Sequence, residues 1–392
     1  MEIPFTSCPE PTLGVEVELH LVDADTGALA NVAGDVLNAL TGQEGAEHPK
    51  AKHELFQSTI EIITDVCTHP AEAVADLRAT LDEVRRAAEP LGAVPMAAGT
   101  HPFSCPEDQQ VSPKDRYHAL IEEMQWTARR LLICGTHFHV GVPSGEHAVA
   151  VLNELLRTMP LLQILSASSP FFEGQDTGMA SVRPKIFESL PTAGLPPEVA
   201  DWADFEEFMG TLVNSGVIRS VKEVWWDIRP HPEFGTVELR MCDASPTFRE
   251  VAALAALAQC LVADAVARFD AGDLPPPPRP WTTRENRWLA SRHGVNADLI
   301  ATADGRRRPA ELLLEELVER LRPTAEGLGC RAEVDDALEI WAAGPSYLRQ
   351  RHIVEAGGTL EDVATHLVGE LRDEEVRAAV PVDAGGDGRR TA

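Results

Sequence analysis

Three short segments of the chain alternate apolar and ionisable side chains with a period of two. They are GVEVELHLV from Gly14, GTHFHVGV from Gly135 and TVELRMC from Thr236. This alternation is typical of β-strands, in which successive side chains point to opposite faces. Each segment therefore predicts a strand with one apolar face and one ionisable face. The ionisable positions are Glu16, Glu18, His137, His139, Glu238 and Arg240.

The same patterns along the rest of the chain predict strands and helices in irregular alternation. Strands are expected at residues 13–22, 28–32, 59–66, 94–98, 131–142, 223–229 and 235–242. Helices are expected where apolar residues recur at helical spacing: 70–88, 115–130, 146–166, 199–215, 249–269, 284–293, 309–327, 333–343 and 360–371. Asp23–Gly27 and Pro230–Phe234 are interpreted as the turns of two hairpins.

This order of elements indicates the fold class. Strands joined by hairpins, with helices grouped after them, favour an α+β fold with a mainly antiparallel sheet over a Rossmann fold. We expect a single domain over residues 1–372, with a sheet-rich part at 1–270, a proline-rich connection at 271–281 and a helical part at 282–372. Residues 373–392, rich in Gly, Ala and charged residues, are expected to form a disordered tail.

Composition and charge exclude several classes of protein. The chain has 392 residues, 44% of them apolar, and a formal net charge of −28. That charge argues against nucleic-acid partners and against anionic membrane surfaces, both of which attract basic proteins. We expect no apolar run long enough to span a bilayer and no signal peptide. Seven scattered cysteines without a CxxC pair fit a reducing cytosol, so we expect a cytoplasmic protein.

The ionisable face of the predicted sheet is the candidate functional site. If the three strands share one sheet, carboxylates, imidazoles and a guanidinium converge on one surface, a composition that suits divalent cations and phosphate. The chain has no GxxxxGK[ST] loop and no GxGxxG after a strand, so any nucleotide would have to be bound by a different structural motif. Neither a GxSxG elbow nor an activated cysteine is visible.

Several motifs in order resemble the carboxylate-amine ligase family, also called glutamate–cysteine ligase type 2. They include TLGVEVELHLVD, ELFQSTIEI, AAGTHPF, GTHFHVGVP, LSASSPFFEGQDTGMAS and WWDIRPHPEFGTVELRMCD, and the likeness runs from about residue 11 to 370. The resemblance implies a glutamine-synthetase-like catalytic fold with helices packed on one face of the sheet. It also implies ATP with Mg²⁺ or Mn²⁺, and activation of a carboxylate as an acyl phosphate before an amine attacks. In glutamate–cysteine ligases this carboxylate is the γ-carboxyl of glutamate.

The resemblance also assigns roles to residues of this chain. It implies metal ligands at Glu16, Glu18, Glu54, Glu61, His139 and Glu238. It implies that Arg240 meets the transferred phosphoryl group, with Glu238 and His139 beside it. Candidates for binding the nucleotide are Arg240, His137, Arg229 and Lys222. One departure is plain: the family commonly reads GVEEEF, and Val17 here replaces the middle acid.

Each site residue also has a structural interpretation. Glu16 and Glu18 could line a solvated edge strand, and His137 could be structural. Glu238 and Arg240 could form a surface ion pair contributing under about 1 kcal/mol. Glu54 does not share parity with Glu61 in a continuous strand, so its role as a ligand needs a bulge or turn. Arg183, Lys222 and Arg229 could bind phosphate or a substrate carboxylate, or simply balance the acidic protein.

Alternative functions stay open at this point. A metal-dependent hydrolase is one, because HxH strands also occur in amidohydrolase barrels. A catalytically inactive relative that binds nucleotide is another, and a γ-glutamyl ligase for the amine of a specialised pathway is a third. The partners expected are small-molecule substrates and a second copy of the chain in a homodimer, for which the helices after Pro280 could supply the surface.

Overall fold

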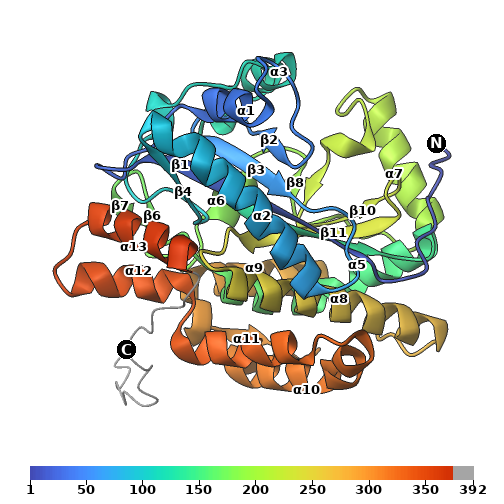
Figure 1. Cartoon of the computed structure of the whole chain (residues 1–392). Helices are drawn as coiled ribbons and strands as arrows, with labels where there is room; N and C mark the ends of the chain where they lie inside the picture. Colours follow the sequence, from blue (N-terminus) through green and yellow to red (C-terminus); the bar gives the residue numbers. More distant parts are fainter. Residues whose placement is uncertain (374–392) are drawn as a thin grey trace.

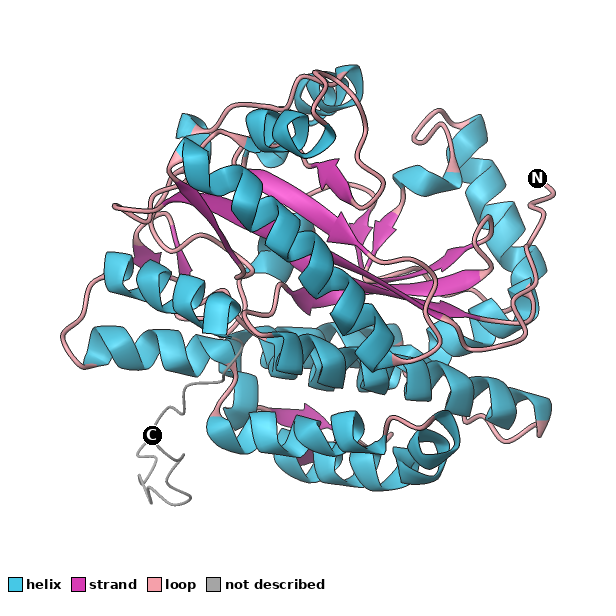
Figure 2. Ribbon diagram, viewed as in Figure 1, coloured by secondary structure: helices cyan, strands magenta, loops and turns pink. Residues whose placement is uncertain are grey.

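A seven-stranded sheet forms the centre of the protein (Figures 1 and 2). The computed structural model describes residues 1–373. The strand order is β10-β11-β5-β1-β3-β2, with β4 also paired to β1, and every pair in this sheet is antiparallel. The α+β fold class with a mainly antiparallel sheet is therefore confirmed. The strands are β1 Leu13–Asp23, β2 Ala51–His53, β3 Thr59–Ile63, β4 Ala93–Met96, β5 Gly135–Gly141, β10 Ile228–His231 and β11 Thr236–Asp243.

Three long helices cover the apolar face of the sheet. They are α2 Pro70–Ala88, α5 Gly145–Ser166 and α8 Phe248–Asp270. Val15, Val17 and Leu19 of β1 are buried on this side, as the alternation of the sequence predicts. Val17 thus lies in the core and away from the acidic face, so its replacement of the family's acid leaves the metal candidates untouched. Helices α10 Ala310–Leu328 and α11 Arg331–Ala343 pack on α8, farther from the sheet (Figure 1).

Smaller elements surround this core. The remaining helices are α1 Ala33–Thr41, α3 Asp115–Met124, α4 Trp126–Arg129, α6 Arg183–Phe187, α7 Trp202–Asn214, α9 Pro280–His293, α12 Ser346–Glu355 and α13 Leu360–Asp373. Short strands form three separate pairs: β6 Phe171–Phe172 with β7 Gln175–Asp176, β8 Ala193–Gly194 with β9 Trp225–Trp226, and β12 Asp298–Ile300 with β13 Arg307–Pro309. Single 3-10 turns are η1 Glu89–Leu91, η2 Pro106–Asp108, η3 Val221–Glu223 and η4 Gly294–Asn296.

Three expected elements differ from those observed. The strand at 28–32 is reduced to one bridge between Val22 and Leu29, because α1 begins at Ala33. The helix at 115–130 is broken at Gln125, whose φ of 49° ends α3. The strand at 223–229 becomes η3, β9 and β10, because Arg229 donates hydrogen bonds back to the carbonyls of Lys222 and Val224 and folds this segment around its guanidinium.

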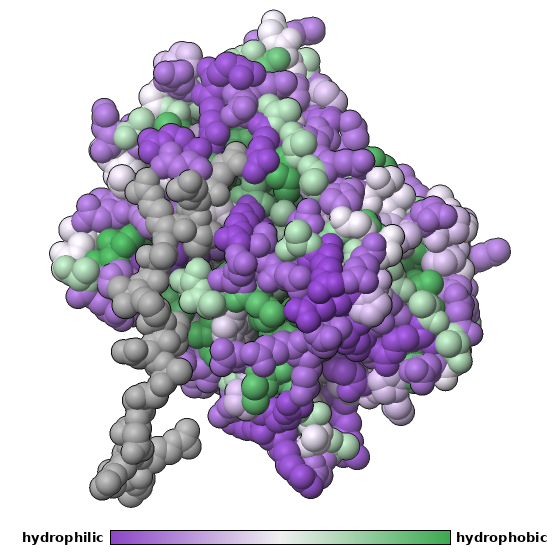
Figure 3. Space-filling view, turned by 60° about the horizontal axis from the view of Figure 1, so that its bottom comes forward, coloured by the Kyte–Doolittle hydropathy of each residue, from purple (hydrophilic) through white to green (hydrophobic). Residues whose placement is uncertain are grey.

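The expectation that no apolar run is long enough to cross a membrane was wrong for two helices. By length and composition alone, α5 and α8 would suffice. However, 78% and 72% of their apolar windows are buried inside the protein, because they form the layer against the sheet. Apolar helices of this kind are also typical of the core of a globular protein. The face shown in Figure 3 is mostly hydrophilic, with apolar residues in small separate patches.

The expected division of the chain into a sheet-rich part, a proline-rich connection and a helical part stays a prediction. The structure does show the connecting segment and the helices that follow it. Residues 272–279 carry no helix or strand, and α9 begins at Pro280. The helix α9 packs on α5, and α10 packs on α8, so the helical part rests on the helices that support the sheet. Asp373 is the last residue of α13, and the rest of the expected tail lies outside the described residues.

Candidate active site

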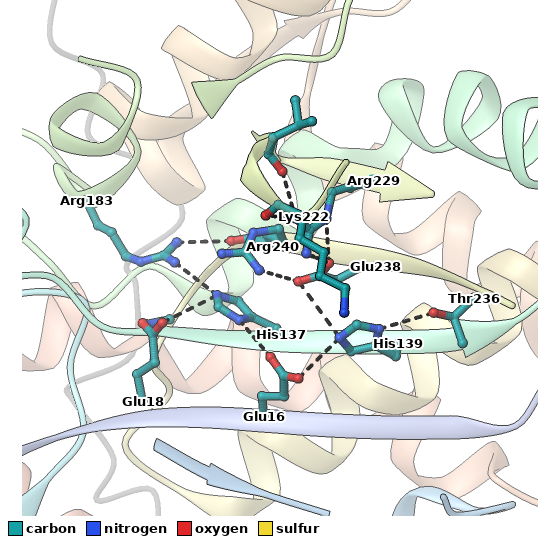
Figure 4. A network of polar contacts seen from close by, with 12 residues as sticks. Glu16, Glu18, His137, His139, Arg183, Lys222, Arg229, Thr236, Glu238 and Arg240 are labelled. Atoms are coloured by element: carbon teal, nitrogen blue, oxygen red, sulfur yellow. Dashed lines mark hydrogen bonds and ion pairs between the residues drawn. The ribbon is translucent and has the colours of Figure 1, made fainter. Parts of the chain in front are cut away.

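The register of five strands brings the predicted residues together on one face of the sheet. On β1, Glu16 lies opposite His137 of β5, and Glu18 lies opposite Glu61 of β3. Glu238 of β11 is flanked by His139 on one side and Arg229 on the other. The prediction that the strands share one sheet and aim these side chains at one surface is confirmed (Figure 4).

Glu16 lies between the two histidines. Its Oε2 is 3.3 Å from Nδ1 of His137, and its Oε1 is 3.3 Å from Nε2 of His139. Burial alone would raise the pKa of this carboxyl, but the hydrogen bonds and charges of the two imidazoles outweigh burial and hold its pKa far below the usual range. Glu16 is therefore a carboxylate in the folded protein.

Glu238 is held by two guanidinium groups. Arg229 donates to its Oε2 from Nε at 2.8 Å and from Nη2 at 2.5 Å, and Arg240 donates to its Oε1. Burial opposes ionisation, but these two positive charges keep the pKa of Glu238 well below its usual range. Only 1% of the Glu238 side chain is exposed, so the interpretation as a surface ion pair is wrong.

The acids at the other end of the cluster lack such partners. Burial, followed by the negative charges of Glu16, Glu54 and Glu18, raises the pKa of Glu61 well above its usual range. Burial and the charge of Glu18 raise the pKa of Glu54 to about 8. These carboxyls repel one another, and ionising all of them at neutral pH calls for added positive charge.

The two histidines have different electrostatic settings. Burial and the charge of Arg240 lower the pKa of His137, which favours the neutral imidazole. Burial also acts against the charged form of His139, but Glu238 and Glu16 outweigh it and raise the pKa of His139. A neutral imidazole is the form that binds metals, and an imidazolium is not. The sequence-based expectation gave the metal role to His139, whereas the groups of side chains close enough to hold a cation contain His137.

Two groups of side chains could each hold a cation. Among residues 1–373, Glu16, His137 and Glu238 offer ligand atoms within 4.8 Å of one another, and so do Glu18, Glu61 and His137. Carboxylate oxygens with one imidazole are donors suited to Mg²⁺ or Mn²⁺. The donor set and the unbalanced acids fit divalent cations, and His137 belongs to both groups.

Two other candidates occupy unexpected positions. Glu54 follows β2, so its side chain is not bound to the parity of β3; the turn after His53 brings the carboxyl close enough to Glu18 and Glu61 for their charges to interact. Lys222 joins the network through its carbonyl oxygen, which accepts from Arg229 at 3.1 Å. Its ammonium is exposed and pairs with Glu233 at 2.5 Å.

Two further residues complete the site: Arg183, which the sequence marks only as a general anion binder, and Gly135, which it does not single out. Arg183, at the start of α6, reaches across to His137 (Figure 4). Gly135, at the start of β5, donates its backbone N–H to Oε2 of Glu18 at 2.5 Å. Both lie in motifs that the sequence displays, but no local pattern shows that a loop after α5 returns to this strand.

Comparison with known proteins gives consistent matches over the whole chain. A family model described as glutamate-cysteine ligase family 2 matches residues 12–377. A candidate glutamate–cysteine ligase 2-1 from Frankia casuarinae is 48% identical over 373 residues, covering 95% of this chain and 98% of that protein. A candidate glutamate–cysteine ligase 2 from Thermobifida fusca is 47% identical, covering 99% of this chain and 96% of that protein.

Two solved structures share the fold at low sequence identity. A bifunctional glutathione synthetase from Pasteurella multocida matches with a TM-score of 0.70 and 14% identity, over 93% of this chain and 52% of that one, so this chain spans about half its length. A glutamate–cysteine ligase from Francisella tularensis in complex with AMP matches with a TM-score of 0.68 and 13% identity, over 95% and 91%. These likenesses concern the fold and support the expected fold class.

The raised pKa of Glu54 predicts a measurable pH dependence in metal-free protein. Because its pKa of about 8 in the folded state lies above the ordinary glutamate pKa of 4.5, its contribution to stability is present below about pH 4.5 and is lost as pH rises towards 8. Glu54→Gln cannot ionise and escapes this loss. In urea unfolding with EDTA, the variant should gain about 1 kcal/mol or more relative to the parent between pH 5 and pH 8.

The matched control is Glu47→Gln, which changes an exposed glutamate paired with Lys114 outside the site. An equal stability difference between Glu54→Gln and the parent at both pH values would show that the pKa of Glu54 is not raised in the folded protein.

Proposed function

The chain belongs to glutamate–cysteine ligase family 2 and is an ATP-dependent carboxylate-amine ligase, and we propose that it joins the γ-carboxyl of glutamate to an amine or amino acid. The observation that carries this proposal is the acidic face on which two candidate cation groups share His137, with Arg240 beside them. A reaction between ATP and a carboxylate brings several negative charges together. This face offers places for the cations that such a reaction needs.

We assign the metal ligands of the proposal from the two groups. Glu16, Glu18, Glu61, Glu238 and His137 would hold Mg²⁺ or Mn²⁺, with Glu54 close enough to add its charge. Bound cations of this kind neutralise phosphate oxygens and align phosphoryl donor and acceptor. His139, whose pKa is raised by Glu238 and Glu16, is the histidine we assign to ATP phosphate.

The residues of the chain then have separate tasks in activating the carboxylate. Arg240 supplies a fixed positive charge where the γ-phosphoryl group leaves ADP, and such a charge acts strongly in a site that excludes water. Arg229 donates two hydrogen bonds to Glu238. Arg240 donates to Glu238 from Nη1, and its remaining N–H donors are the ones we assign to the phosphoryl group. Attack by the substrate carboxylate on the γ-phosphorus gives ADP and an acyl phosphate, and an amine then displaces phosphate.

The proposal leaves the identity of the acceptor amine open. Cysteine is the acceptor named in the relatives' descriptions, and an amine of a specialised pathway fits the same chemistry. The hydrolase alternative finds no support, because the HxH strand β5 lies in an open antiparallel sheet and not in a parallel barrel. We also propose a cytoplasmic location and a homodimer, on composition and on the exposed helices after Pro280 respectively.

Product analysis with purified protein tests the proposed reaction. We expect ADP and phosphate only when ATP, Mg²⁺ or Mn²⁺, L-glutamate and an amine are all present, with the amine supplied from a panel that includes L-cysteine. An acyl phosphate leaves ADP as the nucleotide product, because the γ-phosphoryl group is transferred. Formation of AMP and pyrophosphate together with the amide would contradict the acyl-phosphate mechanism.

Substitution of Arg240 tests its role separately from folding. Arg240→Ala should lower kcat by about a hundredfold or more, since a positioned charge in a site that excludes water contributes about 3 kcal/mol to a transition state. Glu238 keeps its two bonds from Arg229 in this variant, so the chain should still fold. Arg240→Lys should restore activity only in part, because an ammonium lacks the planar fork. Full activity in the alanine variant would remove Arg240 from the mechanism.

A further inference from the structure

Two buried cysteines face each other where the helical part of the chain packs on α8. The Sγ atoms of Cys260 and Cys330 lie 3.5 Å apart, and both residues are fully buried. Cys260 lies within α8, and Cys330 lies in the turn between α10 and α11. They are 70 positions apart in the chain, so their contact joins the helix layer beneath the sheet to the outer helices (Figure 1).

This pair differs from the other five cysteines. All seven are free thiols that lie within residues 1–373. Among these residues, no other two cysteines form a contact between their sulfur atoms, and neither Cys260 nor Cys330 has a side-chain hydrogen bond to any other residue. A single buried thiol needs no reason beyond packing. Two thiols in contact are close to bonding, because a disulfide of about 2.0 Å requires the sulfurs to approach by only about 1.5 Å.

Cys330 is the better nucleophile of the two. It occupies the N-cap position of α11, where the partial positive charge of a helix N-terminus favours a thiolate. The hydrogen bond from the thiol of Cys260 acts in the same direction and lowers the pKa of Cys330. That contact, together with burial, raises the pKa of Cys260. A thiolate beside a thiol is the arrangement of an attacking and a resolving cysteine.

The place of Cys330 in a short turn gives a small oxidant access to its sulfur. The neighbouring residues Gly329, Arg331 and Ala332 are exposed, and Gly329 ends α10 in the left-handed conformation with a φ of 74°. Helix ends and turns open locally at a much lower free-energy cost than core helices. A local opening of this turn would therefore admit a peroxide, which is little larger than water, while α8 stays folded.

We propose that Cys260 and Cys330 form a reversible intramolecular disulfide when the protein meets a hydroperoxide, and that this bond fixes the hairpin of α10 and α11 on α8. The inference concerns a part of the chain away from the acidic face and does not depend on the proposed ligase reaction.

The peroxide is the two-electron oxidant of this reaction. The Cys330 thiolate attacks one peroxide oxygen, the O–O bond breaks, and a sulfenic acid and hydroxide form. The hydroxide takes up the proton that Cys330 had lost, which gives the first water. The sulfur of Cys260 then attacks the sulfenic sulfur, and its proton leaves with the hydroxyl group as a second water. A small thiol reductant reverses the bond by thiol–disulfide exchange.

The two thiols could instead be packing residues alone. Both sulfurs would then stay reduced in the folded protein, because α8, α10 and α11 would keep the oxidant away from them. A disulfide would close a loop of 70 residues that contains α9 and α10. A cross-link over a loop of this length restricts the unfolded chain strongly, so the oxidised protein should melt at a higher temperature than the reduced one.

Peptide mapping of the full chain tests the pairing. The reduced protein is treated with millimolar hydrogen peroxide, cleared of peroxide with catalase, unfolded in the presence of an alkylating agent and digested with trypsin. We expect a cross-linked pair of peptides that contains Cys260 and Cys330 and is lighter by the two thiol hydrogens. Prior treatment with a reductant should return two separate alkylated peptides. Full alkylation of both cysteines after peroxide, or a cross-link that forms only in urea, would overturn the proposal.

Melting temperatures of oxidised and reduced protein test whether the bond fixes the helices. The proteins are the parent, Cys260→Ala, Cys330→Ala and, as the matched control, Cys67→Ala. Cys67 is a buried thiol that contacts a backbone oxygen and no other cysteine. In the parent and the control, the oxidised form should melt about 3 °C or more above the reduced form. The other two variants should show no gain.

Each variant is compared with its own reduced form, so a loss of packing caused by the substitution does not affect the difference. Peptide mapping of the parent decides the pairing by itself if a variant fails to fold. Equal melting temperatures for the oxidised and the reduced parent would overturn the proposed fixing of the hairpin on α8.

Discussion

The two-residue period of β1, β5 and β11 is the constraint on which the rest of the structure depends. It places Val15, Val17 and Leu19 against the helices and Glu16 and Glu18 on the opposite face. Apolar burial on one face provides the stability that lets the other face carry acids that repel one another. A shift of one residue in register would exchange the two faces, so folding and chemistry depend on the same alignment.

Charge is distributed unevenly across the acidic face. At one end, Glu238 is neutralised by Arg229 and Arg240, and His139 bridges it to Glu16. At the other end, Glu18, Glu54 and Glu61 lie close together with few positive neighbours, and burial and their mutual repulsion raise the pKa values of Glu54 and Glu61. The first end is balanced by the protein itself, while the second is balanced best by bound cations. The second end is therefore the part of the face that bound cations would stabilise most.

The sequence predicts the face on which each residue lies better than it predicts the neighbours of that residue. Parity alone places Glu16, Glu18, His137, His139, Glu238 and Arg240 on one surface, and the structure agrees. Parity misjudges Glu54, because the chain turns between β2 and β3 and frees its side chain from the period of two. It gives no sign of the approach of Arg183, which depends on hydrogen bonds between Ser169 and Asp243, 74 residues apart. Long-range contacts of this kind leave no local pattern.

The central claim is that the acidic face holds divalent cations, and a titration of metal-free protein with Mn²⁺ followed by electron paramagnetic resonance tests it most directly. The account predicts about two bound Mn²⁺ ions per chain, one at each group, with His137 as a ligand of only one of them at a time because a neutral imidazole has a single free nitrogen lone pair. It also predicts that Glu61→Gln, which changes one group alone, weakens binding at one of them, while Glu47→Gln leaves both unchanged. Mn²⁺ binding that is absent in the parent, or is unaffected by Glu61→Gln, would contradict the account.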